Sequence, residues 1–301
     1  MKALIASVAV LALAITTWAE EAKTDSGKGP QTAVLRRLPP LDAGKLEPTY
    51  RGDWQSNVGD FSDDKNGVFI RVVERKQEEP RCVAGSRWEV VAESGATWVR
   101  VESTSLSRIT TVRLRLAADN IRYLVRASES PLLARYVALR CVFDVEGLDR
   151  RERIELIESA SGDASAAMRR MATQMAGTYA SSEDAVPILC RALCDPCIEV
   201  ADCACVHLRR LLFPADYKET GGYSRMGSRD AIDRAVRRSV LVFARRVHGV
   251  RPDLVTEADL ATINAMCLPS VGQTERDLEL PTAAEPAEKP NPKKNNQPAP
   301  K

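Results

Sequence analysis

The sequence predicts a mainly α fold, an α-solenoid of short helical hairpins that follows a small N-terminal antiparallel β unit, with disordered tails at both ends. Three observations lead to this prediction. Apolar residues recur at helical spacing after Ala117, they repeat about every 33 residues, and short β-like runs precede them. With 44% hydrophobic residues among 301, the chain can also fill a substantial core.

The N-terminus has the pattern of a secretory signal peptide. A positive residue, Lys2, precedes an apolar run over residues 3–15, and Ala19 offers a small residue for cleavage before Glu20. We therefore expect a signal peptide over residues 1–19 and a mature chain, without a transmembrane helix, in the periplasm or secreted. An uncleaved anchor is the alternative, although this run is shorter than the ~20 residues that span a bilayer.

Two segments are predicted to be disordered linkers or tails. Residues 20–66 and the Pro-rich end, residues 269–301, have too little apolar surface to offset the entropy of ordering. The charge is balanced, with 43 Lys and Arg against 41 Asp and Glu, so bulk charge gives no reason to expect nucleic-acid binding. Function is therefore expected between these two segments.

Residues 67–116 are predicted to form the small β unit. Runs rich in β-branched residues and tryptophan lie at 68–73, 88–91 and 97–101. Ser94 and Gly95 mark a turn between the last two runs. Over residues 68–101 this pattern resembles bacterial SH3-like modules, which implies a peptide-binding or cell-wall-binding role. A structural β cap on the helical part is the alternative.

Residues 117–268 are predicted to be a helical repeat domain. Three helix pairs superpose without a gap when their inner turns are aligned at Ser130, Asp163 and Asp195, which are 33 and then 32 residues apart. Each of these residues can cap the helix that follows, because its side-chain oxygen can accept a hydrogen bond from a free amide. The second helices then share an inner apolar stripe that only Arg135 interrupts. Such hairpins bury their apolar faces by stacking on neighbours.

The third pair carries a family resemblance. The run Ala-Val-Pro-Ile-Leu-Cys-Arg-Ala-Leu-Cys-Asp-Pro at 185–196, with Ala204 behind it, resembles the bacterial HEAT-like repeat, in which an Asp-Pro turn joins a Leu-rich helix to an Ala-bearing one. The resemblance covers residues 118–213 and implies a protein-interaction scaffold. Ala201 departs from the pattern, because the family often carries Arg there.

Two further helices are predicted to close the stack. The first runs from a cap at Ser228 to Gly249, and the second starts at Thr256, where Asp259 completes a capping box. The first helix has a surplus of four positive charges, with candidate binding residues Arg234, Arg237, Arg238 and Arg245. These arginines could bind an acidic protein or anionic lipid of the cell envelope, and a merely solvated face is the alternative.

Five cysteines cluster at Cys190, Cys194, Cys197, Cys203 and Cys205. The four residues from Cys194 to Cys197 resemble the Cys-x-Pro-Cys of thioredoxin-like oxidoreductases, which implies a catalytic dithiol. That family places its motif after a β-strand, whereas here a helix precedes it. Because exported proteins usually pair exposed thiols, a disulfide that involves Cys194, Cys197 or Cys205 is the preferred prediction.

The remaining chemistry of the sequence gives weaker signals. Cys203 and His207 lie four residues apart, a spacing that two zinc ligands on one helix can have. The repeat register instead favours a histidine packed in the core. We therefore expect neither a metal nor a cofactor. The leading expectation is an exported, non-enzymatic scaffold that binds an unidentified protein. A thiol-disulfide oxidoreductase that uses Cys194 and Cys197, and a cell-wall-binding protein that uses the β unit, are the alternatives.

Overall fold

In this computed structural model the described residues are 36–50, 58–74, 85–104, 108–214 and 229–271. Of these residues, 54% are helical and 18% lie in strands. The predicted signal peptide, the Pro-rich end from residue 272, Cys82 and the predicted cap Ser228 lie outside the described residues. No helix among the described residues has the length and apolar character needed to cross a membrane.

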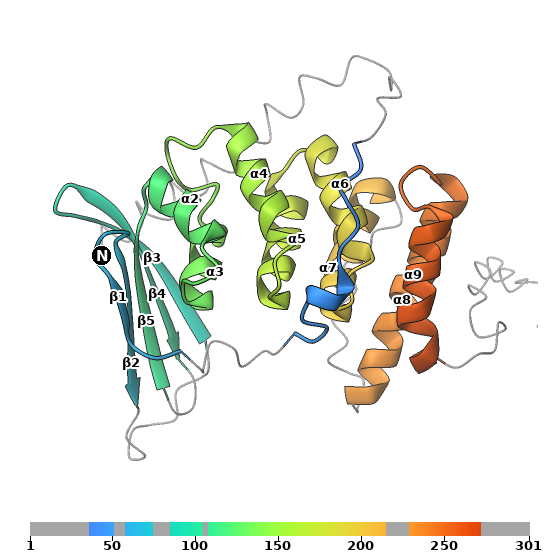
Figure 1. The fold of residues 1–301 in the computed structure, drawn as a ribbon, viewed down its shortest axis with the longest axis horizontal. Helices are drawn as coiled ribbons and strands as arrows, with labels where there is room; N and C mark the ends of the chain where they lie inside the picture. Colours follow the sequence, from blue (N-terminus) through green and yellow to red (C-terminus); the bar gives the residue numbers. More distant parts are fainter. Residues whose placement is uncertain (1–35, 51–57, 75–84, 105–107, 215–228, 272–301) are drawn as a thin grey trace, which may run out of the picture. The chain divides into compact units, whose positions relative to one another are not determined.

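The first part of the fold is a five-stranded antiparallel sheet (Figure 1). Its strands are β1 (Phe61–Asp63), β2 (Val68–Glu74), β3 (Gly85–Glu93), β4 (Ala96–Thr104) and β5 (Arg108–Arg115). Their order in the sheet is β1-β2-β5-β4-β3, so the last strand in the chain lies in the middle. A two-residue turn joins β3 to β4 at the predicted place, where Ser94 and Gly95 both have positive φ.

Within the described residues, eight α-helices follow the sheet: α2 (Ala118–Arg126), α3 (Leu132–Arg140), α4 (Arg150–Ala160), α5 (Ala166–Tyr179), α6 (Ser182–Leu193), α7 (Ile198–Leu212), α8 (Arg229–Val250) and α9 (Glu257–Val271). Consecutive helices pack in pairs, from α2 with α3 to α8 with α9 (Figure 1). The second helices of the first three pairs also pack on one another, α3 on α5 and α5 on α7. A short 3-10 helix, η1 (Ala43–Lys45), precedes the sheet.

The prediction of a mainly α, α-solenoid fold is wrong. The sheet is a full layer and shares one core with the helices, because Val68, Val99, Val112 and Leu114 belong to the same buried cluster as residues of α2 to α6. The sequence prediction omitted β1 and β5. Strand β5 alternates buried residues at 110, 112 and 114 with more exposed ones, and this period of two is the pattern that defines a half-buried strand.

The helix caps also differ from the predicted ones. The residues that precede α3, α5 and α7 are Pro131, Ser165 and Cys197, one or two positions after the predicted caps. Asp163 accepts a hydrogen bond from the amide of Ser165 at 2.9 Å, and Asp195 accepts one from the amide of Cys197 at 2.8 Å. Both aspartates thus order the turn, and the helix starts three residues later. The predicted capping box between Thr256 and Asp259 is present.

Candidate functional site

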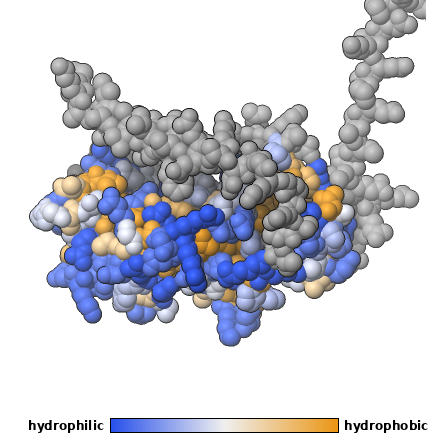
Figure 2. Space-filling model, turned by 90° about the horizontal axis from the view of Figure 1, so that it is seen from above, coloured by the Kyte–Doolittle hydropathy of each residue, from blue (hydrophilic) through white to orange (hydrophobic). Residues whose placement is uncertain are grey.

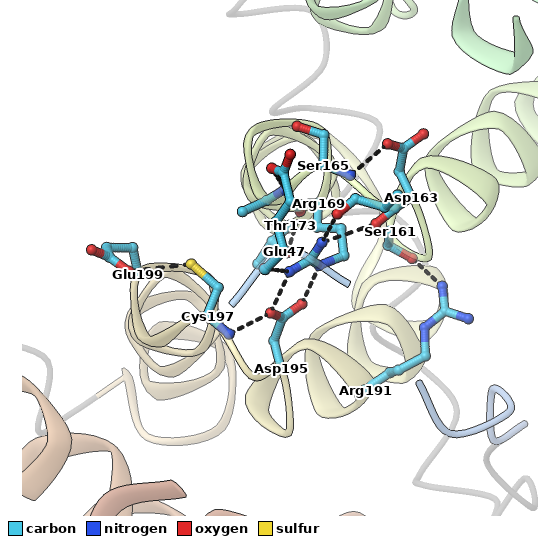
Figure 3. Close-up of polar contacts among 12 residues, drawn as sticks. Glu47, Ser161, Asp163, Ser165, Arg169, Thr173, Arg191, Asp195, Cys197 and Glu199 are labelled. Carbon is cyan, nitrogen blue, oxygen red and sulfur yellow. Dashed lines mark hydrogen bonds and ion pairs between the residues drawn. The ribbon is translucent and has the colours of Figure 1, made fainter. Parts of the chain in front are cut away.

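A buried polar network lies where α5, α7 and the N-terminal segment meet (Figure 3). Arg169 of α5 is fully buried, and so is Asp195 in the turn before α7. The guanidinium donates from Nε to Oδ2 of Asp195 at 2.7 Å and from Nη2 to Oδ1 at 2.9 Å. Its three other N–H groups donate to the carbonyl oxygens of Asp163, Ala164 and Glu47. Every donor of this buried cation therefore has an acceptor.

A second pair repeats this arrangement one helix pair earlier. Arg135 of α3 forms an ion pair with Asp163 in the turn before α5, and both side chains are largely buried. Arg135 interrupts the apolar stripe in the sequence, but in the structure it joins its own helix to the next pair. Each of these two arginines thus reaches forward from a second helix to the aspartate of the following turn.

Residues 37–50 belong to the stretch for which the sequence predicts disorder, yet they make specific contacts. Arg37 forms an ion pair with Asp259 of α9. At the other end, Glu47 accepts a hydrogen bond from the amide of Ala166 at 3.2 Å and so caps the start of α5. The guanidinium of Arg170 lies 5.2 Å from the ring centroid of Tyr50. We call residues 37–50 the N-terminal strap (Figure 1, blue).

The structure places Cys194 and Cys197 at the two ends of the turn between α6 and α7, in surroundings that disfavour thiolates. Burial, and then the carboxylate of Asp259, raises the pKa of Cys194 to about 12. Burial and the hydrogen bond from Sγ of Cys197 to Glu199, 3.2 Å long, raise the pKa of Cys197 to about 12. Since the thiolate is the nucleophile in thiol-disulfide exchange, these surroundings disfavour the reactive form of both thiols.

The remaining members of the cysteine cluster differ in exposure from the repeat register. In the repeat register Cys205 corresponds to Arg140 and Thr173, which predicts contact with water, and Cys203 to Ala138 and Met171, which predicts a core position. In the structure Cys205 is buried and Cys203 is only partly buried. The seven cysteines within the described residues are all free thiols here. The disulfide involving Cys194, Cys197 or Cys205 therefore stays a prediction.

His207 packs on α5 rather than joining a ligand cluster. Its ring lies against Gly177, where even a single added methyl group would overlap it. Burial, and then the positive charge of Arg210, lowers the pKa of His207 to about 4. Within the part of the chain that the structure describes, no group of three or more His, Cys, Asp or Glu side chains is placed to hold a metal ion.

The predicted basic residues of α8 separate into two groups. Arg237 is partly buried and donates to Asp233 at 2.8 Å and to the carbonyl oxygen of Met266 at 2.8 Å. Arg234, Arg238 and Arg245 are exposed. Arg237 therefore joins α8 to α9, and the other three arginines remain as a candidate contact surface.

An aromatic cluster, which the sequence did not single out, connects the sheet to the helices. The guanidinium of Arg140 in α3 lies 6.0 Å from the ring centroid of Trp88 in β3 and 5.7 Å from that of Tyr179 in α5. Trp88 and Tyr179 are 41% and 40% exposed, which is unusual for residues of this size. On the face seen in Figure 2, hydrophobic residues lie in separate patches among hydrophilic ones.

The surface of α2 carries an open depression lined by Asp119, Arg122, Tyr123, Arg126, Ala127 and Glu129. Its central cation is already paired, because Arg122 donates to Asp119 at 2.7 Å and to Glu152 of α4 at 2.8 Å. This depression therefore offers less unpaired charge than α8.

Comparisons of this chain with protein-family models, with curated proteins and with solved structures found no match.

Proposed function

We propose that this chain is an exported, non-catalytic interaction protein that binds an acidic protein partner through α8. The observation that carries the proposal is a stripe of three exposed arginines, Arg234, Arg238 and Arg245. Spacings of four and seven residues place them within about 40° of one another around the helix and over about 16 Å of its length. We call these three residues the arginine stripe.

The arginine stripe has a rigid support. Val240, Phe243, Ala244 and Val247 are buried on other sides of α8, which packs against α7 and α9. Leu241, which is also buried, lies on the side of the stripe itself and anchors the helix beneath it. The 2.8 Å hydrogen bond from Arg237 to the carbonyl oxygen of Met266 fixes α8 on α9. A preordered row of cations loses less conformational entropy on binding than a flexible basic segment does.

The charges of the stripe are also available. Among the described residues no acidic side chain forms an ion pair with Arg234, Arg238 or Arg245, and the one hydrogen bond of the stripe, from Arg245 to Asn264 at 3.4 Å, is long. Arginine suits a protein partner because its planar guanidinium binds a carboxylate with two parallel hydrogen bonds. Carboxylates spaced along a helix or strand would match the stripe.

The proposal can be tested with a fluorescently labelled poly-glutamate peptide as the probe. The triple variant Arg234→Glu/Arg238→Glu/Arg245→Glu should weaken binding by about tenfold or more, since each surface ion pair contributes roughly 0.2–1 kcal/mol and the reversed charges repel. The control variant Arg71→Glu/Arg100→Glu/Arg126→Glu changes the net charge equally at exposed sites elsewhere.

Three outcomes would contradict the proposal: no binding of the peptide at low salt, equal losses in both triple variants, or a preference for anionic phospholipid vesicles over the peptide. The last outcome would assign the stripe to a membrane surface. Thermal unfolding of each variant shows whether the fold is retained.

A further inference from the structure

Strand β3 forms one edge of the sheet. Its nine residues, Gly85–Glu93, pair with β4 on one side, and no described strand pairs with the other side. The strand contains no proline, and its register with β4 is continuous from Gly85 to Glu93. An edge of this length presents a row of free backbone groups that another strand can bind.

The register of the hairpin identifies which backbone groups are free. A two-residue turn closes on the pair Glu93 and Ala96, and hydrogen-bonded pairs then alternate along an antiparallel ladder. The residues between those pairs, Trp88, Val90 and Ala92, turn their amide and carbonyl groups toward the open edge. Their side chains lie on the inner face of the sheet, because Trp88 is opposite the buried Val101 and Val90 opposite the buried Val99.

The helices cover these inner-face side chains only in part, by placing Arg140 of α3 against the ring of Trp88. Helix α3 packs against β5, which lies two strands from β3. Trp88 is consequently 41% exposed and Val90 is 65% exposed, and Ala92 is exposed as well. An apolar strip on the core side of a sheet, beside an open strand edge, is an arrangement that monomers usually avoid.

The strip is complementary to itself. Suppose that two copies of β3 lie antiparallel with Val90 of one copy opposite Val90 of the other. Each residue before Val90 in one copy then lies opposite the residue equally far after Val90 in the second copy, so that the numbers of two opposed residues sum to 180. Trp88 then faces Ala92 of the second copy, so that a large side chain meets a small one. On the outer face Arg87 faces Glu93 of the second copy, which gives two opposite-charge pairs related by the twofold axis.

We propose that two copies of this chain associate through β3, in this register, to form one continuous sheet with five strands from each copy. Charge and side-chain size on β3 together select the register. Centring the twofold axis on Glu89 would place two glutamates opposite each other, and centring it on Val91 would oppose Glu89 to Glu93. Centring it on Trp88 would also place Arg87 opposite Glu89, but it would oppose two indoles on the axis and leave Val90 facing Ser86.

The helices of the two copies fit side by side. Five strand spacings of about 4.8 Å separate the two β5 strands, which is about 24 Å. A pair of packed helices such as α2 and α3 is about 20 Å wide. The second copy can therefore lie on the same sheet without overlap of the helical layers, and its sheet edge covers the exposed strip.

The first test measures the association of the full chain by sedimentation velocity from about 1 to about 100 µM, where weak homodimers dissociate. Val90→Lys should raise the dimer dissociation constant by about tenfold or more, because two ammonium groups would meet on the axis. Arg87→Glu should weaken the dimer similarly, and Arg87→Glu/Glu93→Arg should restore it. Glu93 also pairs with Arg113 at 2.6 Å, so thermal unfolding must confirm that the double variant is folded.

The second test is mild oxidation of Val90→Cys, which should give a disulfide-linked dimer, since directly opposed residues have Cα atoms within the range that a disulfide spans. Arg87→Cys is the matched control, because its two copies would lie about 20 Å apart, six residues along the strand. A monomer at all concentrations, a dimer unaffected by Val90→Lys, or cross-linking at position 87 as efficient as at position 90 would overturn the proposal.

Discussion

Replacing Asp195 by asparagine would leave the buried guanidinium of Arg169 with a neutral partner. Both side chains are completely buried in the wild type, and the two hydrogen bonds between them are 2.7 and 2.9 Å long. The asparagine keeps the shape and one acceptor oxygen, so the change removes charge with little change of volume. Arg169→Met is the complementary change, which leaves Asp195 buried without its cation.

The magnitude follows from the burial of the pair. Breaking a buried ion pair by removing one partner typically costs about 3–5 kcal/mol, because the remaining charge has lost its compensation. Arg169→Met also removes the donors that satisfy the carbonyl oxygens of Asp163, Ala164 and Glu47. We therefore expect each single variant to lose about 3–5 kcal/mol of unfolding free energy and the double variant to lose much less than the sum.

Urea denaturation followed by circular dichroism measures these losses. The control is the exposed pair Arg151 and Glu155 on α4, where Arg151→Met should cost less than about 0.5 kcal/mol because solvent screens the charges. A loss under about 1 kcal/mol in both Asp195→Asn and Arg169→Met, or additive losses in the double variant, would refute this account of the network.

Three further changes test other features. Gly177→Ala should destabilise the chain by about 1–3 kcal/mol, because the added methyl group overlaps the His207 ring. Gly249→Ala is the control and should not destabilise it, because the space around Gly249 is open. Thermal unfolding compares the two variants. The free energy of unfolding should fall as the pH drops from 6.5 toward about 4, because in this range His207 binds a proton in the unfolded chain but not in the folded one. The urea midpoint of His207→Gln should fall less over the same pH range than that of the wild type. Glu47→Ala should cost about 0.5–2 kcal/mol and speed hydrogen exchange in the first turn of α5, and unchanged exchange there would contradict its capping role.

The helices could be predicted from the sequence because the signals that define them lie close together in the chain. Apolar residues at helical spacing, such as Leu156 and Ile188, are buried as their period predicts. The capping box of α9 was equally local, since Thr256 and Asp259 are three residues apart. The turn at Ser94 and Gly95 needed only the positive φ that glycine tolerates.

The sheet was underestimated because β1 and β5 were missed, and β5 pairs with the distant β2 as well as with its chain neighbour β4. Strand β5 contacts β2, whose residue Val68 lies opposite Leu114, and no local signal links residues so far apart in the sequence. The turn aspartates were misassigned for a similar reason. Asp163 and Asp195 look like helix caps in isolation, but each also pairs with an arginine 28 or 26 residues earlier.

The candidate surfaces were predicted unequally. Charge alone identified Arg234, Arg238 and Arg245, but Arg237 had the same sequence signal and turned out to hold α8 on α9. Trp88 looked like an ordinary strand residue, because its exposure depends on which strand α3 covers. Exposure of a strand residue is a property of the assembled layers, which the sequence alone does not reveal.

The N-terminal strap sets an order of events during synthesis. Arg37 is among the first described residues to be made, and its partner Asp259 follows 222 residues later. Glu47 similarly waits for the start of α5, 119 residues later. The Glu47 end of the strap can therefore dock once α5 has been made, whereas the Arg37 end must wait for Asp259 of α9. Closing so long a loop costs more chain entropy than local pairing does, which makes strap docking a late step in folding.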